Sequence, residues 1–109
     1  FDTSRCIVPM SAFYEWKKEG SQKVPYRIFL KNEKFFFVPA LYVEKEREFY
    51  ASLITTTPNR FIEKIHHRMP VILKINEALE YLKNDSEINL ARCIPFASDE
   101  EMEMERAAF

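Results

Sequence analysis

A glutamate set between aromatic residues is the first place where the sequence offers acid–base chemistry. Glu15 lies between Tyr14 and Trp16 in a strand-like run. In strict alternation, Glu15 shares one face of the strand with Phe13 and Lys17, and its two aromatic neighbours take the other face. A carboxylate flanked by aromatic side chains can be partly desolvated, which raises its pKa toward the range useful for proton transfer. The alternative interpretation is a solvated glutamate beside Lys17.

The two histidines of the chain are adjacent, in His66-His67-Arg68. An imidazole that faces a cleft can move protons near neutral pH, and Arg68 can hold a phosphate or carboxylate through two parallel hydrogen bonds. Adjacent residues on a strand point to opposite faces, and no third His or Cys lies at ligand spacing, so the pattern predicts no metal site. The alternative is a pair of surface histidines with an arginine in a salt bridge.

Three threonines, Thr55-Thr56-Thr57, stand at a predicted strand end just before Pro58. Hydroxyls and backbone donors at the start of a helix form a natural anion site. Helix capping is the alternative, and it needs only Thr57 as the N-cap with Pro58 as the first helical residue. Glycine-rich nucleotide-binding loops and the GxSxG nucleophile motif are absent from the sequence, so it supports neither of those classes.

The elements that must position these residues begin with a β-rich half. Alternation and composition predict strands at residues 6–9, 12–17, 26–31, 35–38, 41–43 and 49–56. In the third of these, Tyr26, Ile28 and Leu30 are expected to point inward. The sequence has a single glycine, Gly20, so backbone at positive φ is expected at asparagine or aspartate, for which the candidates are Asn32, Asn84 and Asp85.

The second half changes to helical periodicity. A short helix is predicted at residues 59–65 with Phe61, Ile62 and Ile65 inward, followed by extended chain at residues 69–73. A second, amphipathic helix is predicted at residues 75–83, where the stripe expected to face the core is Ile75, Ala78, Leu79 and Leu82. The acidic tail at residues 98–106 is compatible with a helix or with a fraying terminus. The whole chain is expected to be one α+β domain built around an antiparallel sheet.

Length and composition exclude several classes. A chain of 109 residues with 47% hydrophobic residues is long enough for one folded domain and too apolar to be disordered. The longest uncharged apolar run, residues 35–41, is too short to cross a bilayer.

The net charge of −1 conceals a basic segment, since residues 5–74 hold 13 Lys and Arg against 7 Asp and Glu. Such a segment suits a polyanion partner, although a soluble domain with one basic and one acidic face is the alternative. Cys6 and Cys93 lie among apolar residues and are expected to act as small core hydrophobes.

Taken together and in order, five blocks resemble the SOS response-associated peptidase (SRAP) family, also called abasic-site processing proteins. The blocks are Arg5-Cys6-Ile7-Val8-Pro9, Phe13-Tyr14-Glu15-Trp16-Lys17, Pro25-Tyr26-Arg27-Ile28, Ile54-Thr55-Thr56 and Ile65-His66-His67-Arg68-Met69-Pro70-Val71-Ile72-Leu73. The resemblance covers about residues 5–82 and continues more weakly through residues 95–97 and 101–103. It implies a mainly antiparallel, barrel-like β-sheet with a few short helices, and it implies that residues 1–109 are the C-terminal part of an SRAP domain. The closing strand expected after Met102 has no recognisable match.

The resemblance also implies a function in the response to DNA damage. In this family an N-terminal cysteine, exposed by autoproteolytic removal of the initiator Met, crosslinks covalently to an abasic site in single-stranded DNA through a thiazolidine. By match, Glu15 and His66 are the catalytic residues, and Thr55 and Arg68 line the pocket that binds DNA. The parent protein is therefore expected to be a peptidase- and lyase-type enzyme without cofactor or metal. Cys6 matches a cysteine inside a strand rather than the nucleophile, so this chain alone is expected to be inactive.

Other expectations concern the surroundings of the protein. Because the chain begins at Phe1, we expect a fragment of a longer protein. The resemblance implies a location in the cytoplasm of a bacterium, associated with the nucleoid, or in the nucleus of a eukaryote, and no membrane partner is expected. A truncated sheet would expose an edge through which copies can self-associate. Two alternatives stay open at this point. One is a nucleic-acid-binding or structural β module without chemistry, and the other is a metal-dependent hydrolase that uses His66, His67 and a carboxylate.

Overall fold

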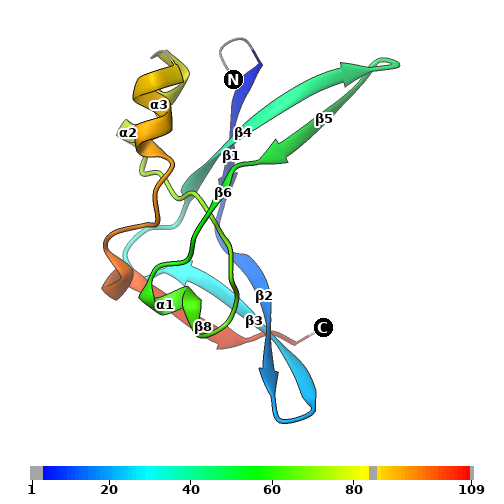
Figure 1. Ribbon diagram of the computed structural model, residues 1–109, viewed down its shortest axis with the longest axis vertical. Helices are drawn as coiled ribbons and strands as arrows, with labels where there is room; N and C mark the ends of the chain where they lie inside the picture. The colour runs from blue at the N-terminus through cyan, green and yellow to red at the C-terminus, as the bar shows by residue number, and fades with distance from the viewer. Residues whose placement is uncertain (1–3, 84–85, 109) are drawn as a thin grey trace.

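The protein folds into two three-stranded antiparallel sheets with short helices beside them (Figure 1). The structure is a computed structural model that describes residues 4–83 and 86–108. One sheet has the order β1-β4-β5, and the other has the order β2-β3-β8. The strand bounds are β1 Arg5–Met10, β2 Phe13–Glu19, β3 Gln22–Leu30, β4 Phe36–Lys45, β5 Glu48–Leu53, β6 Thr55–Thr56, β7 Met69–Pro70 and β8 Met102–Arg106. The predicted α+β class with a mainly antiparallel sheet is confirmed, and the described strands form these two sheets and the short β6–β7 ladder rather than one closed barrel.

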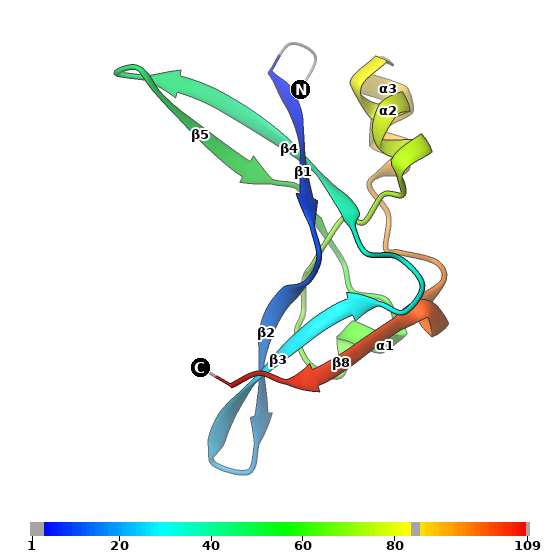
Figure 2. The ribbon, with the colours of Figure 1, turned by 180° about the vertical axis from the view of Figure 1, so that it is seen from behind.

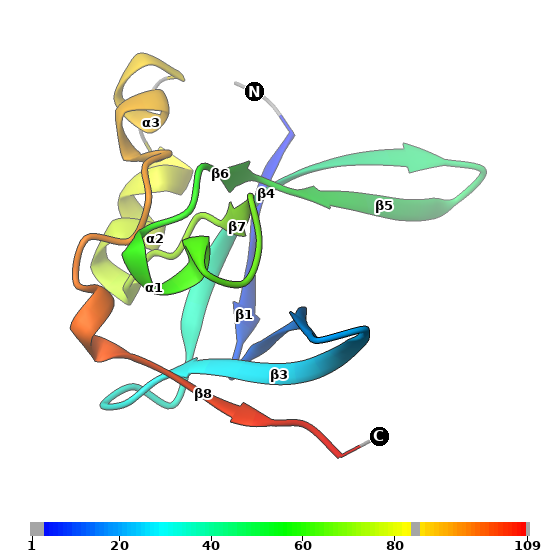
Figure 3. The same ribbon diagram turned by 60° about the horizontal axis from the view of Figure 1, so that its bottom comes forward.

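The two sheets occupy opposite ends of the molecule, and the helices lie along one side. Figure 2 shows the β4–β5 hairpin projecting at one end, away from the helices, and the β2–β3 hairpin at the other. The helices are α1 Arg60–Glu63, α2 Ile75–Lys83, α3 Ser86–Arg92 and the 3-10 turn η1 Asp99–Glu101. Figure 3 shows α1 beside the β6–β7 ladder and α2 and α3 packed as a pair. Among the described residues, no helix combines the length and apolarity that crossing a bilayer requires.

The larger core lies between the β2-β3-β8 sheet and the segments that cross it. Its buried members are Ile28, Leu30, Phe36, Val38, Ile62, Met69, Ile72, Phe96 and Met102. Ile28 and Leu30 point inward as the alternation predicts. The rings of Phe13 and Phe36 pack edge to face with their centroids 6.2 Å apart, an arrangement that stabilises the core beyond the burial of apolar surface. This core fixes β2, α1 and β7 relative to one another.

A smaller core joins α2 to the other sheet. It contains Val71, Leu73, Ala78 and Tyr81. The Tyr81 hydroxyl donates to the Ala40 carbonyl at 3.0 Å, so the phenol is satisfied although the residue is fully buried. The backbone of Phe37 and Leu73 exchanges two hydrogen bonds, which attaches the chain before α2 to β4.

The helix at residues 75–83 forms as predicted, but the predicted buried stripe is wrong. The residues that α2 buries are Ala78 and Tyr81. Ile75, Leu79 and Leu82 are 50%, 44% and 41% exposed. The helix is rotated because Tyr81 packs against β4 and bonds Ala40, and this contact outweighs the aliphatic periodicity. The Glu77 carboxylate caps the helix start by accepting the Lys74 backbone N–H at 3.1 Å.

Two expectations about chain ends and caps also need correction. The acidic tail is neither one helix nor a frayed end, because only Asp99–Glu101 form the 3-10 helix η1 and the chain continues as strand β8. This strand pairs with β3 from Met102 opposite Leu30 to Arg106 opposite Tyr26. This is the closing strand that the sequence did not reveal. The N-cap of α1 is Asn59 rather than Thr57, since the Asn59 side chain accepts from the Ile62 N–H.

The positive-φ residues are not those expected from the sequence. Gly20 has φ 64°, while the other described positions at positive φ are Glu46 at 52° and Arg47 at 68°. These two residues join β4 to β5 in a two-residue hairpin whose geometry requires positive φ at both central positions. Asn32 is not among the positive-φ residues, and Asn84 and Asp85 lie outside the described residues. All six residues of β5 are exposed, and self-association through this outer strand stays a prediction.

Candidate active site

Strand β2 presents Glu15 to the interior side of the sheet. Burial alternates along the strand, with Phe13, Glu15 and Lys17 half-buried and Tyr14 and Trp16 exposed, as predicted. Glu15 lies opposite Tyr26 of β3, so its backbone is held in the middle of an antiparallel pair. The Glu15 side chain is 21% exposed, which contradicts the interpretation of a fully solvated glutamate.

His66 reaches Glu15 from the turn that follows α1. Its backbone N–H donates to the Ile62 carbonyl at 2.9 Å, which ties it to the end of a helix whose Ile62 is buried in the larger core. The His66 Nδ1 atom lies 3.0 Å from Glu15 Oε2. It also lies 2.9 Å from the Arg68 carbonyl oxygen and 3.2 Å from the Arg68 backbone nitrogen.

The surroundings of His66 Nδ1 suit this nitrogen with or without a hydrogen. A carboxylate oxygen and a carbonyl oxygen both accept, and each lies within hydrogen-bond distance of Nδ1. A hydrogen on Nδ1 can bond either of them, whereas a bare Nδ1 accepts from the Arg68 backbone N–H at 3.2 Å. When Nδ1 carries a hydrogen and bonds Glu15, Nε2 is the nitrogen that can take or return a proton. A carboxylate and an imidazole joined in this way form an acid–base pair.

Thr55 and Arg68 are joined to each other next to this pair. Arg68 Nη2 donates to the Thr55 carbonyl at 2.9 Å and to Thr55 Oγ1 at 3.0 Å, and Arg68 Nε lies 3.3 Å from the same hydroxyl. Thr55 is fixed in turn by the β6–β7 ladder, where it pairs with Pro70. These bonds use Nε and Nη2, so Nη1 is the guanidinium nitrogen that can still donate to an anionic ligand.

All four predicted site residues line one cavity of 240 Å³. The rest of its wall is mostly apolar and comes from Met10, Phe13, Tyr14, Leu53, Met69 and Pro70. The structure therefore confirms that Glu15 and His66, 51 positions apart in the numbering, converge on a shared cavity with Thr55 and Arg68. An apolar wall around a few polar groups is typical of a small-molecule site and strengthens hydrogen bonds inside it.

The second histidine does not turn this cavity into a metal site. The His67 ring stacks on that of His66 with centroids 4.5 Å apart and planes 28° from parallel. Across residues 4–83 and 86–108, no three side chains of His, Cys, Asp and Glu gather as a metal ion would require. Stacked rings place their nitrogens side by side rather than toward one point, which does not favour chelation.

A basic groove beside the cavity is not indicated by any of the sequence motifs. It has a volume of 470 Å³, shares His66 with the cavity, and is lined by Trp16, Lys18, Lys23, Glu63, Lys64, Ile65 and His67. Trp16 is 53% exposed in it. Lys18 and Lys23 lie directly opposite each other on β2 and β3, an unfavourable pair unless an anion neutralises it. The excess of Lys and Arg in residues 5–74 is the sequence signal for this groove.

The cysteines lie outside the cavity, as their apolar neighbours predict. Cys6 is in β1 opposite Ala40, and both cysteines are free thiols. The Cys93 Sγ donates to the Asn89 carbonyl at 3.3 Å, and burial raises the pKa of the Cys93 thiol. Because a thiolate is the reactive form, this environment disfavours Cys93 as a nucleophile.

Comparison with known proteins places this geometry in a family. A family model described as SOS response associated peptidase (SRAP) matches residues 1–108. The abasic site processing protein YoaM of Bacillus subtilis (strain 168) is 38% identical over 107 residues, which cover 90% of this chain and 47% of YoaM. The abasic site processing protein YoqW of the same organism is 41% identical over 86 residues, covering 73% of this chain and 38% of YoqW.

A solved crystal structure shows the same fold. A protein from Bacteroides thetaiotaomicron matches with a TM-score of 0.83 at 31% identity, covering 96% of this chain and 50% of that one. The chain thus spans about half the length of YoaM and of the Bacteroides protein. The family model, the relatives and the fold agree, and the chain belongs to the SOS response-associated peptidase (SRAP) family.

Proposed function

We propose that the protein carrying this chain processes abasic sites in single-stranded DNA by forming a covalent crosslink, with Glu15 and His66 as the acid–base pair. The observation that carries the proposal is the 3.0 Å contact between Glu15 Oε2 and His66 Nδ1 in a cavity that also holds Thr55 and Arg68. The names of YoaM and YoqW support abasic-site processing as the activity.

The proposed chemistry begins with the ring-opened sugar, whose C1′ is an aldehyde. The amine of an N-terminal cysteine, exposed by removal of the initiator Met and supplied from outside residues 1–109, adds to C1′ to give a carbinolamine. Loss of water gives an iminium ion, and the cysteine thiol then adds to the same carbon with release of a proton. The product is a thiazolidine, and each step balances without an oxidant or a reductant.

Two of these steps require proton transfer that Glu15 and His66 can supply. The departing hydroxyl of the carbinolamine must be protonated, and a half-buried carboxyl group in an apolar cavity suits that role. The positive iminium ion that follows is stabilised by the carboxylate left behind. His66 Nε2 can exchange a proton on the sugar side, because the contact with Glu15 holds the ring through Nδ1.

The surroundings of the cavity support DNA as the partner. The basic groove offers Lys18, Lys23 and Lys64 to a phosphate backbone and the exposed face of Trp16 to an unpaired base. Lysines that follow a backbone beside an aromatic stacking surface are typical of single-strand binding. Arg68 Nη1 can donate to the phosphate next to the lesion while Thr55 holds the rest of the guanidinium.

The test uses the natural full-length gene product and a single-stranded oligonucleotide with one abasic site. We expect a product that survives denaturing electrophoresis and is lost when the N-terminal cysteine is replaced. Glu15→Gln keeps the shape of the side chain and removes its charge, so the crosslinking rate should fall about 100-fold. Glu44→Gln, at an exposed position on the β4–β5 hairpin, is the matched control and should react like the wild type.

Two results would contradict parts of the proposal. Normal crosslinking by Glu15→Gln would remove Glu15 from its role and leave the crosslink intact. Tight binding of the oligonucleotide by the wild type without any covalent product would instead favour a nucleic-acid-binding module without chemistry.

A further inference from the structure

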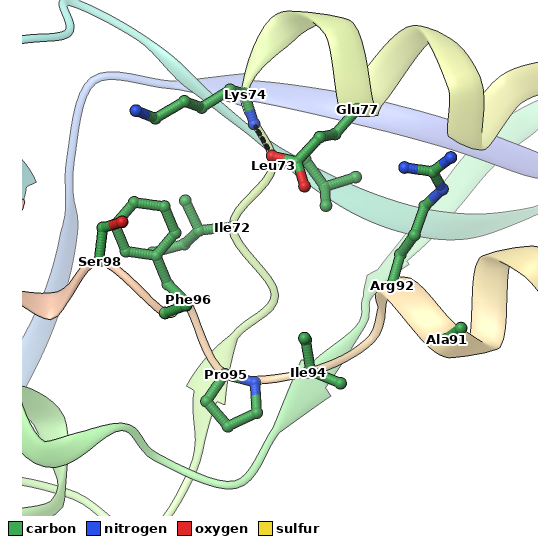
Figure 4. Close-up of a pocket in the computed structure, with 11 residues that line it drawn as sticks. Ile72, Leu73, Lys74, Glu77, Ala91, Arg92, Ile94, Pro95, Phe96 and Ser98 are labelled. Atoms are coloured by element: carbon green, nitrogen blue, oxygen red, sulfur yellow. Dashed lines mark hydrogen bonds between the residues drawn. The ribbon is translucent and has the colours of Figure 1, made fainter.

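The active-site cavity and the basic groove meet at one side chain, because His66 lines both of them. Its neighbour His67 lines the groove but not the cavity. By contrast, the pocket beside α2 and α3 shares no residue with the cavity or the groove, and the Lys74 backbone N–H in its wall already bonds Glu77 (Figure 4). The junction at His66 is therefore the place where a further residue can act on the proposed active site.

The His67 ring reaches His66 because the chain bends between two anchored points. Side chains alternate on a strand, but His67 lies at a bend rather than in a strand, so both rings can project to the same side. Before the bend, the His66 backbone N–H donates to the Ile62 carbonyl at 2.9 Å. After it, Met69 is buried in the larger core and pairs with Thr56 in the β6–β7 ladder. The backbone that carries His67 is thus fixed on both sides.

The polar contacts of the His66 ring act on one edge of it. Among the residues that the structure describes, these contacts all go through Nδ1, which lies 3.0 Å from Glu15 Oε2 and 2.9 Å from the Arg68 carbonyl oxygen. The side chain is 38% exposed, so the wall of the cavity does not enclose the ring. A hydrogen bond tolerates misalignment of about 30°, and contacts at one edge alone therefore leave the direction of Nε2 loosely defined.

The stack with His67 supplies a constraint on the face of the same ring. The two centroids lie 4.5 Å apart and the planes are 28° from parallel, so the rings contact each other over their faces. A pair of stacked aromatic rings is favourable beyond the surface that it buries, and turning the His66 ring out of its plane would break this contact. Glu15 and Arg68 thus fix the edge of the imidazole, and His67 fixes its plane.

We propose that His67 is a positioning residue, which holds the plane of the His66 imidazole so that Nε2 faces the reacting sugar. This inference rests on the proposed function, because it gives His67 a part in the same crosslinking reaction. His67 acts through His66 and transfers no proton itself. The role requires a flat ring at position 67 but not the nitrogens of that ring, so phenylalanine can replace His67 and alanine cannot.

The test measures the crosslinking rate of the natural full-length gene product against the concentration of a single-stranded oligonucleotide with one abasic site. His67→Ala should lower the rate constant at saturating DNA by about three- to tenfold, the effect of losing one aromatic contact. The DNA concentration that gives half the maximal rate should change by less than about twofold, since Lys18, Lys23 and Lys64 still line the groove. His67→Phe should keep the rate constant within about twofold of the wild type. Phe35→Ala, which removes a 58% exposed ring just before β4, is the matched control and should react as the wild type does.

Proton NMR of the same proteins reads the stack itself. The His66 ring protons should be shifted upfield by the neighbouring ring in the wild type and in His67→Phe, and this shift should be lost in His67→Ala. No upfield shift in the wild type would overturn the proposal. Because His67 is exposed, both variants are expected to keep the fold.

The kinetic outcomes separate this proposal from the one on which it rests. A wild type that forms no covalent product would contradict the proposed function itself. With a reactive wild type, an unchanged rate constant in His67→Ala would overturn the role of His67 alone. A rate constant in His67→Phe as low as in His67→Ala would show that the imidazole nitrogens matter rather than the flat ring. A loss confined to the half-maximal DNA concentration would make His67 a DNA contact instead of a positioning residue.

Discussion

The two ends of the molecule bury their apolar residues to very different extents. The β2-β3-β8 end is backed by a cluster of nine buried residues, and α1 and β7 each contribute to it. The end formed by β1-β4-β5 with α2 and α3 has a buried cluster of four. Large apolar side chains are exposed there, among them Phe49 at 67% and Leu90 at 62%. The proposed active site belongs to the first end.

This difference indicates where geometry is fixed and where it is adjustable. Glu15 and His66 stand on β2 and on the turn after α1, which contact the larger core, so their contact is held by packing on both sides. Sites held in this way need little rearrangement when a substrate binds. A region with few buried contacts opens at lower free energy and responds more to whatever covers it.

The largest expected effect compares one aliphatic truncation in each region. Ile28→Ala, in a fully buried position of the larger core, should lower the free energy of unfolding by about 2–5 kcal/mol, because it removes buried methylenes and leaves a cavity. Leu79→Ala, at a position 44% exposed on α2, should change it by about 0.5 kcal/mol or less. Urea denaturation of both variants measures the difference. Equal losses would mean that the two regions do not differ in packing as the structure shows.

The next effect concerns pH and belongs to the smaller core. Burial raises the pKa of Tyr81 to about 12, from an ordinary value of 10.0. Because the folded pKa is the higher one, the stabilisation is complete below pH 10 and is lost as the pH rises from 10 to about 12. The free energy of unfolding should fall by about 2–3 kcal/mol over this window.

Tyr81→Phe separates this effect from general alkaline unfolding. It removes the titrating group and its bond to Ala40, so it should start less stable by about 1 kcal/mol and lose less between pH 10 and 12. Tyr26→Phe is the control from the other end, where the hydrogen bond from the Tyr26 hydroxyl to Glu19 raises the Tyr26 pKa. It should keep the Tyr81 transition. An unchanged pH profile in Tyr81→Phe would contradict the assignment.

Residue types and spacing named candidates for the site, and the resemblance to the SRAP family joined them. An acid between aromatic residues and a histidine before an apolar run are local signals that single out Glu15 and His66, but each has a bland alternative, and only the resemblance predicted that the two share a pocket with Thr55 and Arg68. Strand β8 was missed because its charge concealed its alternation, although Met102 and Met104 face the core and Glu103 and Glu105 face out. The alternation becomes visible only once β3 is known to lack a second neighbour.

The face of α2 could not be predicted for a different reason. Helical periodicity shows which residues share one face of a helix, but α2 has two neighbouring faces that could pack against the core. One face carries the aliphatic residues Ile75, Leu79 and Leu82, and the other carries Tyr81. The burial of Tyr81 with its bond to Ala40 decides between them, and that partner lies 41 residues away in sequence. Non-local contacts of this kind override local propensity. The cap of α1 was assigned to Thr57 for a similar reason, because the ties of Asn59 to distant residues were not visible.

A third, smaller effect would come from loosening that cap at the well-packed end. The Asn59 side chain accepts from the Ile62 N–H at 3.0 Å and donates to the Phe96 carbonyl at 2.9 Å, so it joins α1 to the segment before η1. Asn59→Ala should lower the free energy of unfolding by about 1–2 kcal/mol. Asn59→Asp keeps the cap acceptor and loses the donor, so its loss should be smaller. Asn76→Ala, at an exposed position on α2, is the control in urea denaturation and should be near neutral.

The smallest effect has the opposite sign and lies at the exposed end. Glu46 and Arg47 hold positive φ, a conformation that costs an ordinary L-residue about 1 kcal/mol, at a hairpin turn that suits Asn-Gly. Replacing them by Glu46→Asn and Arg47→Gly should raise the free energy of unfolding by about 0.5–1 kcal/mol, because the turn strain is relieved. Arg47→Ala, which removes the same charge but keeps a Cβ, should give no gain. The exposed strand β5 buries no side chain in the core, so the turn should be the main source of local stability in this hairpin. The added stability should then appear as slower amide exchange confined to β4 and β5. Slower exchange in β2 and β3 as well would mean that the two ends of the molecule unfold as one unit. The two ends would then differ in how many apolar residues they bury but not in local stability.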